Sequence, residues 1–240
     1  MRKVYIRYKE DLPETTMCAS ALNGMRDRSI HTTPFYGFGD IESITDLSVD
    51  VGIVGYVGDI HQALKVLGLP KPKTIDYPDC LNDWMHRKTW QSTLGEMCDH
   101  YAEKVFIKPA TEEKLFTGFV WPNACWKAAS CSMDTEVLVS DAVDFKTEYR
   151  VFVKDCEILD CRRYKGDWAL ALDRTRTLEA VEAMSGWKGC PRAYCLDLGI
   201  TDESNCCLVE VNDAYSFGHY GLSDCLYASM LEARWEEIVG

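Results

Sequence analysis

The order of apolar and polar residues predicts a small α/β layer in the first 80 or so residues. The stretch KVYIRY, at residues 3–8, predicts a first strand. Residues 49–72 predict a strand, a glycine turn and a helix, because Ile60, Ala63, Leu64 and Leu67 recur at helical spacing. A proline-punctuated connection, PKPKTIDYPDCL, then closes this layer.

The rest of the chain predicts an α+β body, in which runs of adjacent strands are separated by helices. Residues 82–104 predict one long helix, because Trp90, Leu94, Met97 and Tyr101 lie on one side of it. Further strands are expected at residues 104–110, 136–140, 147–154, 156–163, 192–200 and 206–213, and further helices at 176–187 and 222–240. These elements place domain boundaries near residues 80 and 133.

Composition and charge narrow the classes of function. The start of the chain is basic but has no apolar segment typical of a signal peptide, and no run is long enough for a membrane-spanning helix, so we expect a cytoplasmic protein. The net charge of -12 and the pI of about 4.9 disfavour binding to nucleic acids or to membranes. Such a charge fits a free enzyme, and it equally fits a decoy that imitates nucleic acid toward a basic partner.

The twelve cysteines and the glycines near residue 55 do not form a recognisable motif. No Cys-x-x-Cys pair occurs, so free thiols are expected rather than disulfides, and a structural zinc site is a less favoured alternative. The glycines at 52, 55 and 58 do not match Gly-x-Gly-x-x-Gly, which disfavours a dinucleotide site there.

The strand LVEV, at residues 208–211, carries an acidic residue and continues directly into Asn212-Asp213. Because side chains alternate along a strand, Glu210 and Asn212 share one face while Val209 and Val211 share the other. Residues two apart on a strand are roughly 7 Å apart at Cα, so both polar side chains can reach one pair of hard cations. The alternative is an ordinary edge strand with a polar outer face.

A second carboxylate is expected beside this pair. Asp197 lies inside the apolar stretch AYCLDLGI, and the polar turn TDESNC joins that stretch to the next strand. If the two strands pair, Asp197 lies next to Glu210 and Asn212. Two carboxylates and an amide suit Mg²⁺, which completes its octahedron with phosphate oxygens and water.

Two lysines and an arginine are candidates to bind phosphate. Lys108 ends the apolar stretch VFIKPA, where a buried ammonium needs an anion, unless the side chain only extends to solvent. Lys88, at the start of the predicted long helix, is a weaker candidate. Arg150 lies between aromatic and branched residues in TEYRVFV and needs an anionic partner, either Glu148 or a phosphate.

Downstream, CRRYKGD gathers Arg162, Arg163 and Lys165 within four positions of an acidic chain. Such a local basic cluster favours an anionic ligand.

The order of VFIKPA, EYRVFV, CLDLGI and LVEVNDAYSFG resembles the ATP-grasp superfamily, and most closely its RimK-like ligases. The earlier segment VGYVGDIHQALKVLGLPKP resembles the pre-ATP-grasp domain of the largely phage-borne R2K clade. The resemblance implies a small N-terminal α/β domain at residues 1–80. It also implies an ATP-grasp domain at residues 81–240, with α+β subdomains of about 81–133 and 134–240 that hold ATP between antiparallel sheets.

The resemblance also implies roles for individual residues in nucleotide binding. Lys108 would contact the α- and β-phosphates, with Lys88 as a second lysine. Backbone groups near Val139 and Ser140 would bind adenine, and Asp141 would touch the ribose. The usual glycine-rich phosphate loop is replaced by ATEEKLFTGF, in which Lys114 is the expected compensating cation.

For the chemistry, the resemblance implies that Arg150 holds the γ-phosphate or an acyl-phosphate, and that Asp197, Glu210 and Asn212 bind Mg²⁺. We expect Arg162, Arg163 and Lys165 to bind the carboxylate substrate. The expected activity is that of a carboxylate–amine ligase that uses ATP and Mg²⁺ and forms an acyl-phosphate, located in the cytoplasm, or in the host cytoplasm if the gene is carried by a phage. The alternatives are a nucleotide- or partner-binding module without turnover, and a kinase on the same fold.

Overall fold

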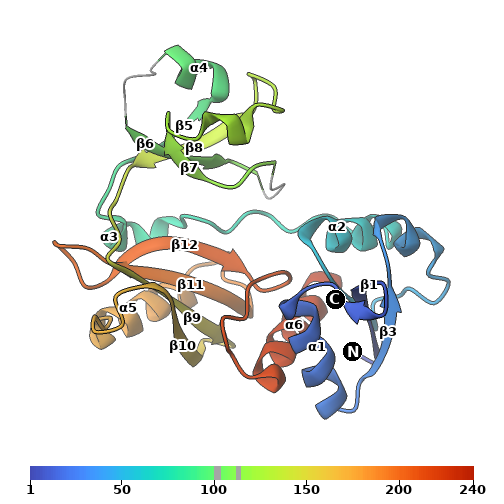
Figure 1. Cartoon of the computed structure of the whole chain (residues 1–240). Helices are drawn as coiled ribbons and strands as arrows, with labels where there is room; N and C mark the ends of the chain where they lie inside the picture. The colour runs from blue at the N-terminus through green and yellow to red at the C-terminus, as the bar shows by residue number, and fades with distance from the viewer. Residues whose placement is uncertain (100–103, 112–114) are drawn as a thin grey trace.

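The structure is a computed structural model that describes residues 1–99, 104–111 and 115–240. Its described residues form three four-stranded sheets. Figure 1 shows the sheet of β5 to β8 above the sheet of β9 to β12, with the N-terminal sheet beside the latter. Among the described residues, no helix is both long enough and apolar enough to cross a membrane.

In the N-terminal sheet, β1 lies parallel to β3 and β4 and antiparallel to β2. Strands β1 and β4 and helix α2 confirm the predicted strand, turn and helix of this layer, while α1 and β3 are additional to them. Helix α1 begins after Thr15, whose side chain caps the helix by accepting a hydrogen bond from the Cys18 N–H. The elements are β1 (Lys3–Lys9), β2 (Leu12–Pro13), α1 (Thr16–Asp27), β3 (His31–Phe35), η1 (Phe38–Ser43), β4 (Val51–Val54) and α2 (Val57–Val66).

The β5–β8 sheet replaces much of the predicted long helix. The prediction of one helix over residues 82–104 is wrong, because strand β5 separates two short helices, α3 and α4. His86 ends α3 in the left-handed conformation, with φ 47°, and the β-favouring stretch TWQST then pairs with β8. The elements of this part are η2 (Asp79–Leu81), α3 (Asn82–Met85), β5 (Thr89–Thr93), α4 (Leu94–Asp99), β6 (Val105–Pro109), β7 (Phe119–Trp121), η3 (Cys125–Ala128) and β8 (Glu136–Asp141).

The predicted boundary near residue 133 needs correction. Strand β8 pairs with both β5 and β6 in antiparallel fashion, so it belongs to the first sheet of the body. The chain passes to the next sheet only between Asp141 and Thr147. Hydrogen bonding along β8 on both edges is the physical reason that these residues stay with the earlier subdomain.

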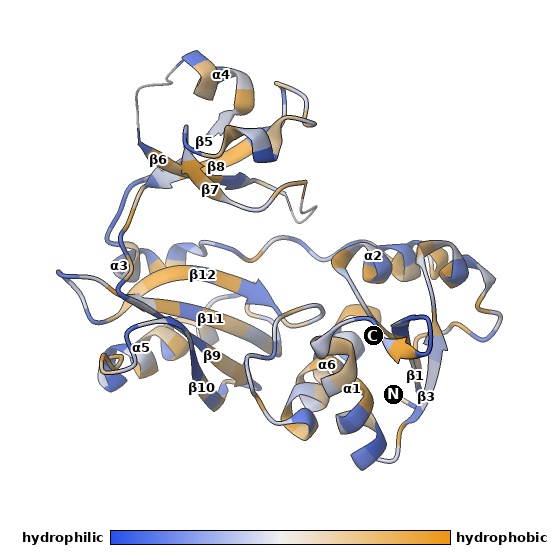
Figure 2. Ribbon diagram, viewed as in Figure 1, coloured by the Kyte–Doolittle hydropathy of each residue, from blue (hydrophilic) through white to orange (hydrophobic). Residues whose placement is uncertain are grey.

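The β9–β12 sheet is antiparallel in the order β10-β9-β11-β12, and it confirms the predicted strands of this region. One of its faces packs on α3 and α5 through a cluster of buried residues that includes Val151, Leu196 and Val211. Figure 2 shows that β12 is apolar along most of its length and polar at its C-terminal end. The elements are β9 (Thr147–Lys154), β10 (Glu157–Gly166), α5 (Arg174–Ser185), β11 (Ala193–Ile200), β12 (Cys207–Asp213) and α6 (Asp224–Val239).

The C-terminal helix α6 joins the body to the N-terminal layer. It packs against α1, and its buried residues share one core with Val4 and Ile6 of β1 and with Phe152 of β9. The two helices approach closely at Gly24, where an added Cβ would lie 1.9 Å from the carbonyl oxygen of Asp224. The N-terminal layer and the β9–β12 sheet therefore have a common core.

This close approach makes a testable prediction. We expect Gly24→Ala to lower the free energy of unfolding by about 1–3 kcal/mol, because the new methyl group forces the two helices apart. The matched control is Gly58→Ala in α2, where an added Cβ meets nothing nearer than Phe38 at 3.9 Å. That control should raise the same free energy by about 0.4–1 kcal/mol. Urea denaturation measures both, and equal effects of the two substitutions would contradict the prediction.

Candidate functional site

A row of four charged residues crosses one face of the β9–β12 sheet. Arg162 of β10 lies opposite Arg150 of β9, Arg150 lies opposite Asp197 of β11, and Asp197 lies opposite Glu210 of β12. Directly opposed residues of antiparallel strands share a face. The pairing register therefore brings together side chains that lie up to 60 positions apart in the sequence, as with Arg150 and Glu210.

Arg150 and Asp197 form a buried two-point ion pair. The Nε and Nη2 of Arg150 donate to the two carboxylate oxygens of Asp197 at 2.7 and 2.6 Å, and Nη1 donates to the Gly218 carbonyl at 3.2 Å. The side chains are only 5% and 1% exposed. Burial raises the pKa of Asp197 to about 6, although Arg150 opposes this shift.

The alternative partner for Arg150, Glu148, is excluded by the geometry. Glu148 instead accepts a hydrogen bond from the Tyr164 hydroxyl at 2.8 Å and forms an ion pair with Lys165. Glu148 and Arg150 do share a strand face, but Asp197 lies directly across from Arg150.

The predicted adjacency of Asp197, Glu210 and Asn212 is present. The Asn212 side-chain amide donates to Glu210 at 2.9 Å and lies 3.4 Å from Asp197, while Val211 faces the buried core. Within residues 1–99, 104–111 and 115–240, no group of three or more His, Cys, Asp or Glu side chains gathers that could hold a metal. Two carboxylates and a side-chain amide do lie together here, and oxygen atoms of such groups are the ligands that Mg²⁺ prefers.

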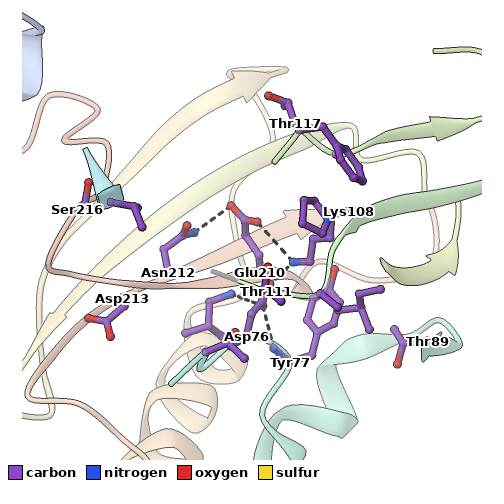
Figure 3. A pocket seen from close by; sticks show the side chains of 18 of the residues that line it. Asp76, Tyr77, Thr89, Lys108, Thr111, Thr117, Glu210, Asn212, Asp213 and Ser216 are labelled. Atoms are coloured by element: carbon purple, nitrogen blue, oxygen red, sulfur yellow. Dashed lines mark hydrogen bonds and ion pairs between the residues drawn. The ribbon is translucent and has the colours of Figure 1, made fainter. Parts of the chain in front are cut away.

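Lys108 projects from the β5–β8 sheet toward these groups. In the sheet it lies opposite Leu138, which in turn lies opposite Gln91, so these three side chains share one face. The ammonium of Lys108 lies 3.7 Å from Glu210 and forms a close ion pair with Asp76. Figure 3 shows Lys108 and Glu210 pointing toward each other, with Asn212 beside Glu210.

A cavity of about 480 Å³ separates the two sheets at this point, which is within the range of about 300–1,000 Å³ for small-molecule sites. It is lined from both sheets, from the segment before α3 and from the start of α2, by residues that include Lys108, Glu210, Asn212, Asp76, Tyr77 and Val57. A second cavity of about 430 Å³ lies next to it and shares Val57 and Ser216 with it.

Asp76 lines the same cavity, although no sequence motif marks it. It lies in the proline-punctuated connection. Apolar residues there do not recur at the spacing of a helix or strand, so the sequence does not indicate which of them are buried. The one local signal is Ile75, an apolar residue in a polar stretch, which is buried at 6% exposure.

Several of the predicted nucleotide-contacting residues do not line the cavity. Lys88 is exposed, and its backbone N–H donates to the Asp141 carboxylate at 2.9 Å. Val139 belongs to the buried core of its sheet, and Ser140 is buried in the same central strand. The cavity wall is formed instead by Leu138 of this strand. Lys114 lies outside the described residues.

The basic cluster of β10 lies at the far edge of its sheet from β12. Arg162 and Arg163 are exposed; Arg162 pairs with Asp160 at 2.7 Å, and Arg163 donates to the Gly166 carbonyl at 2.7 Å. Lys165 pairs with Glu148. These three residues do not line the cavity that holds Lys108 and Glu210.

Comparisons with solved structures agree on the fold. D-alanine–D-alanine ligase from Bacillus anthracis superposes with a TM-score of 0.59 at 12% identity, covering 98% of this chain and 97% of that chain. N5-carboxyaminoimidazole synthetase from Staphylococcus aureus gives a TM-score of 0.60 at 7% identity, over 98% and 77% of the two chains. A RimK domain ATP-grasp protein from Sphaerobacter thermophilus gives 0.55 at 14% identity, over 99% of each chain.

Among curated proteins, no match to this sequence is found. A family model does match: residues 84–230, more than half of the chain, fit the ATP-grasp domain of R2K clade family 2. The matched segment contains Lys108, Arg150, Asp197, Glu210 and Asn212. The chain therefore belongs to the ATP-grasp family, in family 2 of its R2K clade.

Proposed function

We propose that this protein is an ATP- and Mg²⁺-dependent carboxylate–amine ligase that acts through an acyl-phosphate. The observation that carries the proposal is the meeting of Lys108, Glu210 and Asn212 at one cavity between two antiparallel sheets. Cationic and oxygen-bearing side chains that converge in such a space are suited to a nucleotide triphosphate and its metal. The solved complex of D-alanine–D-alanine ligase from Bacillus anthracis with ATP, which has this fold with a TM-score of 0.58, is consistent with it.

In this proposal the side chains of the protein position the nucleotide and neutralise its negative charge. Lys108 would bind phosphate oxygens from the side of the β5–β8 sheet. Glu210, Asn212 and Asp197 would hold Mg²⁺, which neutralises charge on the phosphoryl group that is transferred. Arg150, fixed by Asp197 within 4.0 Å of Glu210, would add positive charge at the same end of the site.

The second cavity favours a ligase over a module that only binds nucleotide. Its walls are mostly apolar, with Met17, Val57, Leu115 and Phe217 among them, and it shares two lining residues with the first cavity. A ligase must hold a carboxylate and an amine next to the nucleotide, and this adjoining space can accommodate one of them. A kinase would also need a second substrate, but it would release a stable phosphorylated product.

The proposal predicts that ATP stabilises the protein only when Mg²⁺ is present. Ligand at about 100 times its dissociation constant should add roughly 2.7 kcal/mol to the free energy of unfolding. The double substitution Glu210→Gln/Asn212→Ala should remove this Mg²⁺-dependent gain, because it removes a carboxylate and an amide from the proposed metal ligands. Thermal denaturation with ATP, with and without Mg²⁺, provides the measurement.

The matched control is Glu157→Gln/Asn205→Ala, which makes the same chemical changes at two exposed positions. Glu157 is the first residue of β10, and Asn205 lies in the turn between β11 and β12. It should keep the full gain. Release of ADP in the presence of pooled carboxylates and amines then tests turnover, and it should require both substrate classes. No stabilisation of the wild type by ATP at any Mg²⁺ concentration would contradict the proposal.

A further inference from the structure

The connection between the N-terminal layer and the body passes along the nucleotide cavity. Figure 1 shows this segment running from α2 to α3 between the upper and lower sheets. Three of its residues, Thr74, Asp76 and Tyr77, line the cavity beside Lys108 and Glu210. The segment is therefore part of the wall of the site and not only a tether.

Asp76 joins the two sheets through this segment. One of its carboxylate oxygens pairs with the ammonium of Lys108 in β6. The other accepts a hydrogen bond from the backbone N–H of Val211 in β12 at 2.8 Å, and also from the N–H of Tyr77 at 2.8 Å. Val211 lies between Glu210 and Asn212, so the same carboxylate contacts the lysine and the strand that carries the proposed metal ligands.

Lys108 is held from more than one side. Its ammonium lies 4.2 Å from the centre of the Tyr77 ring, which is a favourable distance for a cation–π contact. Burial alone would lower the pKa of Lys108, but the carboxylate of Asp76 raises it above its ordinary value and so keeps the ammonium charged. Lysine has a long, flexible side chain, and a contact that fixes it beforehand reduces the ordering needed when a ligand binds.

We propose that Asp76 is a positioning residue that orients Lys108 for the phosphates of the nucleotide, which rests on the nucleotide-binding role proposed above. The arrangement is comparable in its physics to the lysine–glutamate ion pair that protein kinases need before their strand lysine can hold ATP phosphates. In this role Asp76 acts through Lys108. The hydrogen bonds that its carboxylate accepts from the backbone N–H groups of Val211 and Tyr77 fix where the lysine is held.

The test compares nucleotides with and without phosphates. Isothermal titration with ATP, ADP and adenosine is carried out on the wild type and on Asp76→Asn, which keeps the size of the side chain and an oxygen that can accept from Val211. We expect ATP and ADP to bind about tenfold more weakly to Asp76→Asn, and adenosine to bind within about twofold of the wild type. The control is Asp79→Asn, an exposed carboxylate three positions further along the chain, which should bind all three ligands like the wild type.

A double substitution distinguishes positioning from a general structural role. In a Lys108→Met background, Asp76→Asn should cause no further loss of ATP affinity, because its effect passes through the lysine. If Asp76 had only a structural role, Asp76→Asn would weaken adenosine binding too. It would also still weaken ATP binding in the Lys108→Met background. If Asp76→Asn does not fold, Asp76→Ser serves as the second variant, with the same expected pattern.

The outcomes separate this inference from the function on which it rests. If the wild type binds no ATP, the proposed function fails. If the wild type binds ATP and Lys108→Met weakens that binding, but Asp76→Asn binds ATP as tightly as the wild type or more tightly, the proposed function stands and the positioning role of Asp76 is overturned.

Discussion

Replacing Lys108 by methionine is expected to weaken ATP binding by about 10- to 100-fold, because a hydrogen bond to a charged group contributes about 1.5–3 kcal/mol. The side chain of Lys108 is 15% exposed and points into the cavity that Glu210 also lines. Methionine has nearly the same length without the charge. Adenosine lacks phosphates, so its affinity should stay within about twofold of the wild-type value. Isothermal titration of both ligands measures the difference.

The same substitution at Lys88 shows whether a second lysine contacts the nucleotide. The family resemblance implies such a contact, whereas Lys88 is exposed and does not line the cavity. From this placement we expect Lys88→Met to bind ATP like the wild type. A loss of ATP affinity in Lys88→Met as large as that in Lys108→Met would support the contact that the resemblance implies. An equal loss of ATP and adenosine affinity in Lys108→Met would contradict the assignment of this lysine to the phosphates.

The second large effect is expected in stability, at the buried pair of Arg150 and Asp197. Arg150→Met should lower the free energy of unfolding by about 3–5 kcal/mol, because it leaves a buried carboxylate without its partner. The total for a domain is about 5–15 kcal/mol, so this is a large fraction of it. Adding Asp197→Leu to the same protein should recover most of the loss, since replacing both members of a buried pair by apolar residues is often nearly neutral. Urea denaturation of the single and double variants measures the two values.

An exposed pair serves as the control for this prediction. Arg192 and Asp155 lie 2.9 Å apart, with side chains 45% and 46% exposed. Arg192→Met should change the free energy of unfolding by no more than about 1 kcal/mol, because solvent screens such a pair. If Arg150→Met were as mild as Arg192→Met, the ion pair would contribute far less than its burial indicates.

The sequence alone predicts the strands of the β9–β12 sheet well, because each is a short stretch rich in apolar and β-branched residues and short turns join β9 to β10 and β11 to β12. The adjacency of Asp197, Glu210 and Asn212 follows from the same two facts, since a strand, a short polar turn and a second strand pair in antiparallel fashion. The partner of Arg150 does not follow, because a nearby carboxylate on its own strand is as plausible from sequence as one on a strand 47 positions away. Only the pairing register decides between them.

The region of residues 82–104 shows where periodicity misleads. The apolar spacing from Trp90 to Tyr101 matches a helix, but Trp90 is 37% exposed on a strand, while Leu94 and Met97 are buried in the short helix α4. Pairing of TWQST with β8 overrides the local pattern. Asp76 could not be predicted for a related reason, because its partners lie 32 and 135 positions away and its own segment has no regular structure.

The packing of α6 on α1 has a consequence for how the protein is made. Ser20 of α1 hydrogen-bonds to Asp224 at the start of α6, and the two lie 204 positions apart. At translation rates of about 5–20 residues per second, α1 leaves the ribosome roughly 10–40 s before its partner helix does. During that interval the apolar side of α1, with Leu22 and Met25 on it, lacks the surface that covers it in the finished protein. The core of the N-terminal layer is thus completed only after α6 has been synthesised, although most of its own residues are made long before.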